Sequence, residues 1–169
     1  MHRPRPPFQD SFERFKRHMP KGRDVTLIVL KTHLLVEAEM NELLELLLPH
    51  PEFLYRSRFT FLQRLRVLQA VSHDPRRQAL TEAMECLNEL RNSLAHQLEQ
   101  PKTKEQAARF IELAFNAAAK MPYLAGSQAA KEAEEAASYS LVALKQAAAV
   151  VVGSLMNQKR NAQQRPAAT

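Results

Sequence analysis

The feature that most constrains the fold is a long apolar run between Asp24 and Leu48. Leucine, isoleucine, valine and methionine recur on nearly every side of a helix drawn through this run. A helix that is apolar all round is usually buried at the centre of a protein. Asp24 is a suitable N-cap, and Pro49 and Pro51 end the helix. The sequence therefore predicts a central helix that reaches Leu48 and is covered by other elements.

The rest of the chain also favours helices. Ala, Leu, Glu, Gln, Arg and Lys dominate, only three residues are Gly, and nothing alternates with the period of two that a half-buried strand requires. We expect an all-α bundle of about five to seven helices, in which Leu27–Leu48 and Leu80–Leu98 pack antiparallel at the core. Besides the central helix, helices are expected at residues 8–19, 51–56, 59–71, 103–121 and 128–156, and the helix that contains Leu80–Leu98 is expected over residues 76–98.

The helices suggest one main domain with two appendages. Residues 1–23 form a basic extension with a short helix, residues 24–156 form a single bundle that ends in an Ala-rich helix over 128–156, and residues 157–169 form a polar tail. No signal-peptide pattern is found near the N-terminus. The apolar stretch Leu141–Leu155 contains Lys145 and Gln146 and is too short to span a bilayer. We expect a cytoplasmic protein without a membrane partner.

Positive charge is concentrated in separate segments. The formal net charge is +6, yet residues 1–23 hold seven Lys or Arg against two acids, and residues 55–77 hold six Arg against Asp74 alone. Arginine pairs bidentately with phosphate, so this pattern suits RNA, although solvated helix faces give the same pattern. Aromatic side chains among these arginines either stack on RNA bases or pack in the core: Tyr55, Phe59 and Phe61. The candidate RNA-binding residues are Arg56, Arg58, Arg64 and Arg66.

The single cysteine, Cys86, excludes an intramolecular disulfide. It lies inside a predicted helix beside Leu87, where we expect a buried and unreactive thiol. The sequence contains no cluster of carboxylate, histidine and cysteine residues with metal-ligand spacing. We therefore expect neither a metal nor another cofactor.

The helix over residues 76–98 carries a polar stripe that points away from its apolar face. That apolar face should pack into the core and consists of Leu80, Ala83, Met84, Leu87, Leu90, Leu94 and Leu98. Asn88, Asn92 and His96 follow one another at four-residue spacing, and Arg91 borders the apolar face. Arg91 and His96 are five residues apart, about 140° around a straight helix, so one helix alone does not aim both at the same atom. Two copies related by a two-fold axis could place both pairs in one cleft. We therefore expect a homodimer through this stripe.

The string Leu87-Asn88-Glu89-Leu90-Arg91-Asn92-Ser93-Leu94-Ala95-His96 resembles the signature of the HEPN superfamily, in which an Arg precedes a His by a few residues. The resemblance covers about residues 24–120 and implies a helical bundle that dimerises along its motif helices. It further implies a metal-independent endoribonuclease of the toxin or defence type, whose partner antitoxin would be a separate chain. In such an enzyme His96 would serve as general base or acid at the ribose 2′-hydroxyl, Arg91 would stabilise the scissile phosphate, and Asn92 would position RNA or its partner arginine. The products would carry 2′,3′-cyclic phosphates.

Other interpretations of these residues stay open. His33, Glu37 and Asn41 run along the central helix at four-residue spacing; they form either an internally satisfied polar strip or a support, with Asn88, that orients the motif residues. Arg91 could instead pair with glutamates, and a histidine near a helix C-terminus is favoured by the helix dipole. The chain could thus be a non-catalytic nucleic-acid-binding or regulatory module, or a helical adaptor for a protein partner.

Overall fold

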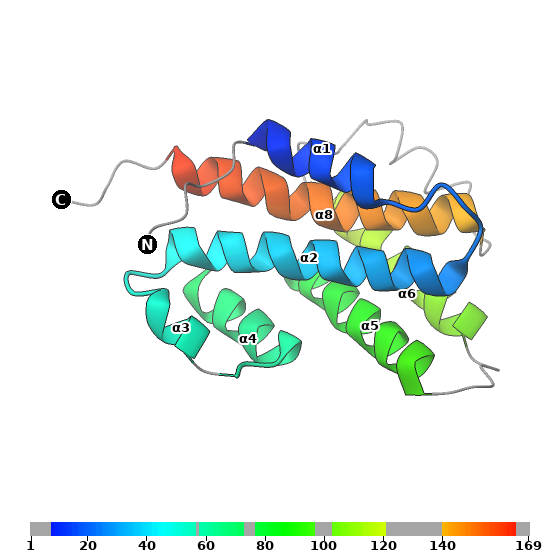
Figure 1. The fold of residues 1–169 in the computed structure, drawn as a ribbon, viewed down its shortest axis with the longest axis horizontal. Coiled ribbons are helices and arrows are strands. Elements are labelled where there is room, and N and C mark those ends of the chain that lie inside the picture. The colour runs from blue at the N-terminus through cyan, green and yellow to red at the C-terminus, as the bar shows by residue number, and fades with distance from the viewer. Residues whose placement is uncertain (1–7, 57, 73–76, 97–102, 121–139, 165–169) are drawn as a thin grey trace.

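In a computed structural model of the protein, the described residues form seven helices and contain no strand (Figure 1). These residues are 8–56, 58–72, 77–96, 103–120 and 140–164. The expected all-α bundle is confirmed. The helices are α1 (Phe8–His18), α2 (Val25–Leu47), α3 (Glu52–Arg56), α4 (Phe61–Val71), α5 (Arg77–His96), α6 (Thr103–Ala119) and α8 (Leu141–Gln163).

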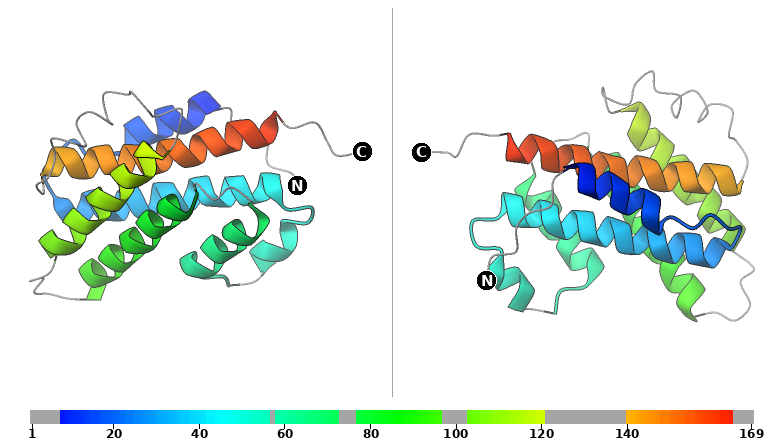
Figure 2. Two further views of the ribbon diagram at one scale, coloured as in Figure 1. Left: turned by 180° about the vertical axis from the view of Figure 1, so that it is seen from behind. Right: turned by 45° about the horizontal axis from the view of Figure 1, so that its top comes forward.

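Helix α2 lies at the centre of the bundle. It packs against α8 on one side and against α4 and α5 on another, while α1 lies across the α2–α8 pair (Figures 1 and 2). The carboxylate of Asp24 accepts a hydrogen bond from the backbone N–H of Leu27 at 3.0 Å, as an N-cap should. The helix ends at Leu47, just before Pro49. The prediction of a central, N-capped helix from the apolar run is thus confirmed.

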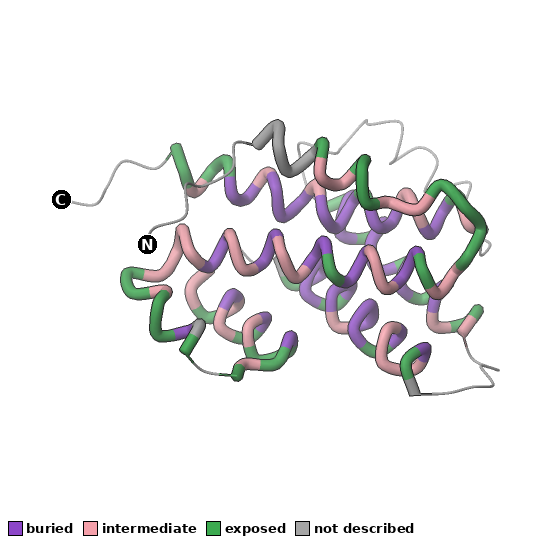
Figure 3. The backbone as a smooth tube through the Cα atoms, viewed as in Figure 1, coloured by how far each residue is buried: buried purple, intermediate pink, exposed green. Residues whose placement is uncertain are grey.

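Helix α5 presents its apolar face to the core. It packs most extensively on α6, and it crosses α2 obliquely while running in the opposite direction (Figure 1). Leu98, which the sequence placed on the same face, lies outside the described residues. The burial predicted from the helical period is confirmed for Leu80, Ala83, Met84, Leu87, Leu90 and Leu94 (Figure 3).

Helix α8 differs from the prediction. It starts after the N-cap Ser140 and continues beyond Met156 to Gln163, so the expected boundary between the last helix and a polar tail is wrong. The polar residues Gln158 and Lys159 are buried rather than solvated. By length and composition α8 could cross a membrane, but 61% of its most apolar window is buried inside the bundle. The expected beginning of this helix, at residue 128, lies outside the described residues.

A cluster of buried charges fastens α1 and α8 to α2. Arg14 Nη1 donates to Glu42 at 2.6 Å and the same guanidinium pairs with Glu39, while Lys159 pairs with both carboxylates. The side chain of Glu39 is fully buried and that of Lys159 is 6% exposed. Burial opposes the charge on Glu42, but the hydrogen bonds from Arg14 and Lys159 outweigh it and lower the pKa of this carboxyl group. The basic extension is therefore part of the bundle through α1.

Candidate functional site

The seam between α2 and α5 contains a buried polar pair. His33 Nε2 lies 3.2 Å from Asn88 Oδ1, and both side chains are buried. The expectation that Asn88 points away from the core is wrong. Asn88 lies one helical turn after Met84, whose side chain is 1% exposed. The side chain of Asn88 therefore lies at the edge of the apolar face of α5 and points toward α2.

The environment of His33 favours the neutral form of its imidazole. Its ring lies against the ring of Phe61 from α4, with 4.5 Å between the centroids. Burial lowers the pKa of His33, and the nearby charge of Arg91 lowers it further, while the contact with Asn88 and the charge of Glu37 act in the opposite direction. A neutral imidazole that bonds Asn88 can hold α5 against α2.

Arg91 and Asn92 lie together one turn beyond this pair. Arg91 Nη1 donates to Asn92 Oδ1 at 3.0 Å, and both side chains are half-buried. His96 is the last residue of α5, and its side chain lies outside the described part of the structure. The structure thus places three of the four polar motif positions on one side of α5 next to α2, in the order Asn88, Arg91 and Asn92.

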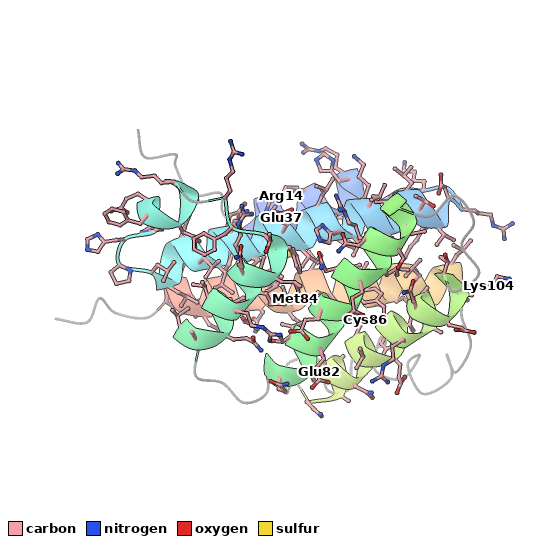
Figure 4. All side chains as sticks on the ribbon, turned by 90° about the horizontal axis from the view of Figure 1, so that it is seen from below. Arg14, Glu37, Glu82, Met84, Cys86 and Lys104 are labelled. Carbon is pink, nitrogen blue, oxygen red and sulfur yellow. The ribbon has the colours of Figure 1, made fainter. Side chains whose placement is uncertain are left out.

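The polar strip of α2 is satisfied by neighbouring helices. Arg64 of α4 donates to Glu37 Oε1 at 2.7 Å and to Asn41 Oδ1 at 3.4 Å. Together with the His33–Asn88 contact, these bonds account for the strip and favour the internally satisfied interpretation. Figure 4 labels Glu37 on α2 and Met84 on α5. Glu37 pairs with Arg64, and its charge near His33 acts to raise the pKa of that imidazole.

No protein family, curated protein or solved structure was found to match this chain.

The four candidate RNA-binding arginines differ in their surroundings. Arg64 is 20% exposed and forms an internal ion pair with α2, whereas Arg66 is 64% exposed and pairs with Glu85 of α5 at 2.7 Å. Arg56 and Arg58 are exposed. Phosphate therefore has readier access to these last two guanidinium groups than to that of Arg64.

The aromatic residues near these arginines also differ in how far they are buried. Phe61 is buried and Phe59 packs against the core, so core packing is confirmed for both; the side chain of Tyr55 lies outside the described residues. Phe53 of α3, which the sequence did not single out, has a side chain that is 60% exposed.

Cys86 lies between α5 and α6 (Figure 4), where its Sγ donates weakly to the backbone oxygen of Gln106 at 3.8 Å. Burial, with a smaller contribution from Glu89, raises the pKa of the thiol to about 11. A thiol with so high a pKa forms little thiolate near neutral pH. Within the described residues, no three His, Cys, Asp or Glu side chains come together in an arrangement that could hold a metal ion.

Proposed function

We propose that this chain is a HEPN-like, metal-independent endoribonuclease that cleaves single-stranded RNA as a homodimer. The observation that supports it best is the cluster at the C-terminal half of α5: Arg91 and Asn92 are joined by a hydrogen bond, half-buried, and held beside α2 by the His33–Asn88 pair. His96 ends the same helix. An arginine and a histidine five residues apart on one helix supply the two groups that RNA cleavage needs, a fixed charge for charge stabilisation and a group for proton transfer.

The proposed reaction is an internal transesterification. The ribose 2′-oxygen attacks the adjacent phosphorus, the bond from phosphorus to the 5′-oxygen breaks, and a 2′,3′-cyclic phosphate forms. His96 accepts the 2′-hydroxyl proton or donates a proton to the leaving 5′-oxygen. Arg91 stabilises the negative charge on the phosphoryl oxygens, and Asn92 keeps the guanidinium oriented through the bond that joins them.

The dimer is supported by apolar side chains beside the motif helix. Leu27 and Leu34 of α2 are 43% and 59% exposed, and their seven-residue spacing puts them on one face of the helix. Large apolar side chains on one exposed face are typical of an interaction surface. A second copy seated there would cover both leucines and bring its own α5 toward Arg91 and His96. Leu34→Glu is expected to raise the dimer dissociation constant in analytical ultracentrifugation without unfolding the chain.

The chemical proposal is tested with purified protein and single-stranded RNA in EDTA. His96→Ala is expected to slow cleavage by roughly 10²–10⁴-fold, the usual contribution of a positioned acid or base. Arg91→Ala removes charge stabilisation and is expected to slow it by roughly 10²–10³-fold. Arg91→Lys should rescue poorly, because a point charge does not replace a planar fork. The matched controls remove an exposed arginine and an exposed histidine elsewhere: Arg109→Ala, where the side chain is 58% exposed, and His18→Ala.

Two results would lead to another function, and a third would support the toxin role. If the wild-type protein binds RNA but releases no cyclic-phosphate ends, the protein is a non-catalytic binding module. If it neither binds nor cuts RNA, a helical adaptor for a protein partner becomes the better interpretation. If it cuts RNA and slows cell growth when expressed, while His96→Ala restores growth, a toxin role is supported, and a separately encoded antitoxin chain should be sought by co-purification.

A further inference from the structure

The segment that joins α1 to α2 carries a group of exposed cations. Arg17, Lys21 and Arg23 are exposed, and within the part of the chain that the structure describes none of them forms an ion pair. Asp24 is the only acid between residues 14 and 24, and its carboxylate is occupied as the N-cap of α2. A cation in the last turn of a helix complements the helix dipole, which accounts for Arg17 but not for Lys21 and Arg23, because both follow the end of α1.

This segment is tied to the bundle on both sides. Arg14 of α1 pairs with Glu42 of α2 at 2.6 Å. Lys145, near the start of α8, donates from Nζ to the backbone oxygen of Gly22 at 3.0 Å, and it adds a further positive charge beside the exposed three. Binding to charges on a backbone that is already held in place costs less conformational entropy than binding to a loose segment. The segment is therefore suited to hold an anion.

The segment lies at the same end of the molecule as the last turns of α5. The beginnings of α2 and α8 and the C-terminal end of α5 lie at this end, whereas α3 lies at the opposite end (Figures 1 and 2). From the His33–Asn88 contact α5 runs against the direction of α2, so Arg91 lies toward the beginning of α2. The arginines that the sequence favoured for RNA are less well placed, because Arg56 ends α3 and Arg64 forms an internal ion pair. A strand bound at the motif is therefore closer to the α1–α2 segment than to α3.

We propose that Arg17, Lys21 and Arg23, the basic patch, bind the phosphate backbone of single-stranded RNA on its way to the motif on α5. Arginine and lysine side chains neutralise phosphates and release the counterions condensed on them, which gives binding that weakens as salt is added. That the strand is RNA rests on the proposed function, whereas the affinity for phosphate rests on the exposed charges of the patch itself.

An anionic membrane surface fits the basic patch less well than a nucleic acid does. Helices that bind membranes insert an apolar face between the lipids. The described apolar side chains at the end of α1, Phe15 and Met19, are packed against the core instead. The end of α1 therefore offers charge without a free apolar face, as expected for a surface that contacts the phosphates of a strand.

The binding experiment uses the full-length wild-type protein and a fluorescein-labelled, single-stranded oligodeoxynucleotide. This probe keeps the phosphates but lacks the 2′-hydroxyl that the proposed cleavage needs, so the protein cannot consume it. The patch variant replaces all three residues of the basic patch with alanine, and fluorescence anisotropy measures its affinity at several salt concentrations. The matched control variant removes the same residue types from exposed positions outside the patch: Arg109→Ala, Lys120→Ala and Arg160→Ala. Both variants lose the same charge, so a difference between them reports where the charges lie.

The two variants should differ in the dependence of binding on salt. Each phosphate contact with a single strand contributes about 0.7 to the slope of log affinity against log salt concentration, so three contacts contribute about 2. Between about 50 and 200 mM salt, the affinity of the wild type should therefore fall roughly 20-fold further than that of the patch variant, and the control variant should follow the wild type. A further variant, Arg17→Lys with Arg23→Lys, keeps the charge and should keep most of the slope.

The outcomes separate the basic patch from the proposed enzyme. If the wild type cuts no RNA but the patch variant loses the expected part of the slope, the patch is supported and the enzyme is not. If the wild type cuts RNA while the patch variant keeps the slope of the wild type, the enzyme is supported and the patch is overturned. The patch is also overturned if its residues govern binding to phosphatidylserine vesicles but not to the oligonucleotide, or if the wild type binds no oligonucleotide at all.

Discussion

Replacing Lys159 with methionine is expected to destabilise the protein far more than the loss of one surface charge would. The Lys159 side chain is 6% exposed and pairs with Glu39, which is fully buried, and with Glu42, which is 21% exposed. Methionine fills a similar volume but leaves two carboxylates with one cation, Arg14. Removing one partner of a buried ion pair costs about 3–5 kcal/mol. Because water can still reach Glu42, we expect about 3 kcal/mol, at the lower end of that range.

Urea unfolding followed by far-ultraviolet circular dichroism measures this difference. With a denaturant dependence of about 1–3 kcal/mol per molar urea, a loss of 3 kcal/mol moves the midpoint down by at least about 1 M. The control is Lys16→Met, which makes the same change on α1 at a side chain that is 52% exposed and paired with Glu13. Exposed pairs contribute about 0–1 kcal/mol, so the control midpoint should stay close to that of the wild type.

A second substitution separates the buried charge from the lost packing. Adding Glu39→Gln to Lys159→Met removes the carboxylate that was left in excess, so the double variant should be more stable than Lys159→Met alone. If Lys159→Met instead unfolds within about 1 kcal/mol of Lys16→Met, the cluster does not carry the stability that its burial implies. The reasoning about the attachment of α1 and α8 would then fail.

Three further predictions follow from single contacts. Because burial lowers the pKa of His33, the unfolded chain takes up its proton first, and the free energy of unfolding should fall as the pH drops below about 6.5. His33→Gln should therefore make the thermal midpoint less dependent on pH between about pH 7 and 5. A variant whose midpoint depends on pH as steeply as that of the wild type would refute this. Cys86, with its pKa raised to about 11, should react with a disulfide reagent much faster in urea than in the folded protein. Thr60→Ala, which breaks the capping box with Gln63, should cost about 0.5–2 kcal/mol in urea unfolding, and Thr60→Ser should cost little.

Local patterns were sufficient to predict most of the helices. The apolar run after Asp24 and the buried face of α5 were predictable because helical periodicity and capping depend on residues within one or two turns. The start of α4 was set two residues too early because the capping box of Thr60 and Gln63 was overlooked. That pattern is also local, so the sequence contained the information needed to correct it.

Long-range pairing was not predictable in the same way. Gln158 and Lys159 have the composition of a solvated tail, yet Lys159 is buried because its charge meets Glu39 and Glu42, more than a hundred residues earlier. Arg14 looked like one cation of a basic extension for the same reason. A single sequence gives no indication of which distant charges will meet, so the helix at residues 8–19 was predicted but its attachment through Arg14 was not, and the last helix was ended too early.

The motif on α5 also depends on a long-range contact that the sequence pattern did not predict. The sequence treated Asn88, Asn92 and His96 as one stripe available to a partner, whereas Asn88 is buried against His33, a residue 55 positions earlier. A second copy of the chain therefore cannot use Asn88, and the proposed two-fold axis must pass nearer the last turns of α5. Since α2 and α5 run in opposite directions from the His33–Asn88 contact, those turns lie toward the end of α2 that exposes Leu27. The buried pair thus sets the register of the two helices, and through it the part of the motif that a dimer could share.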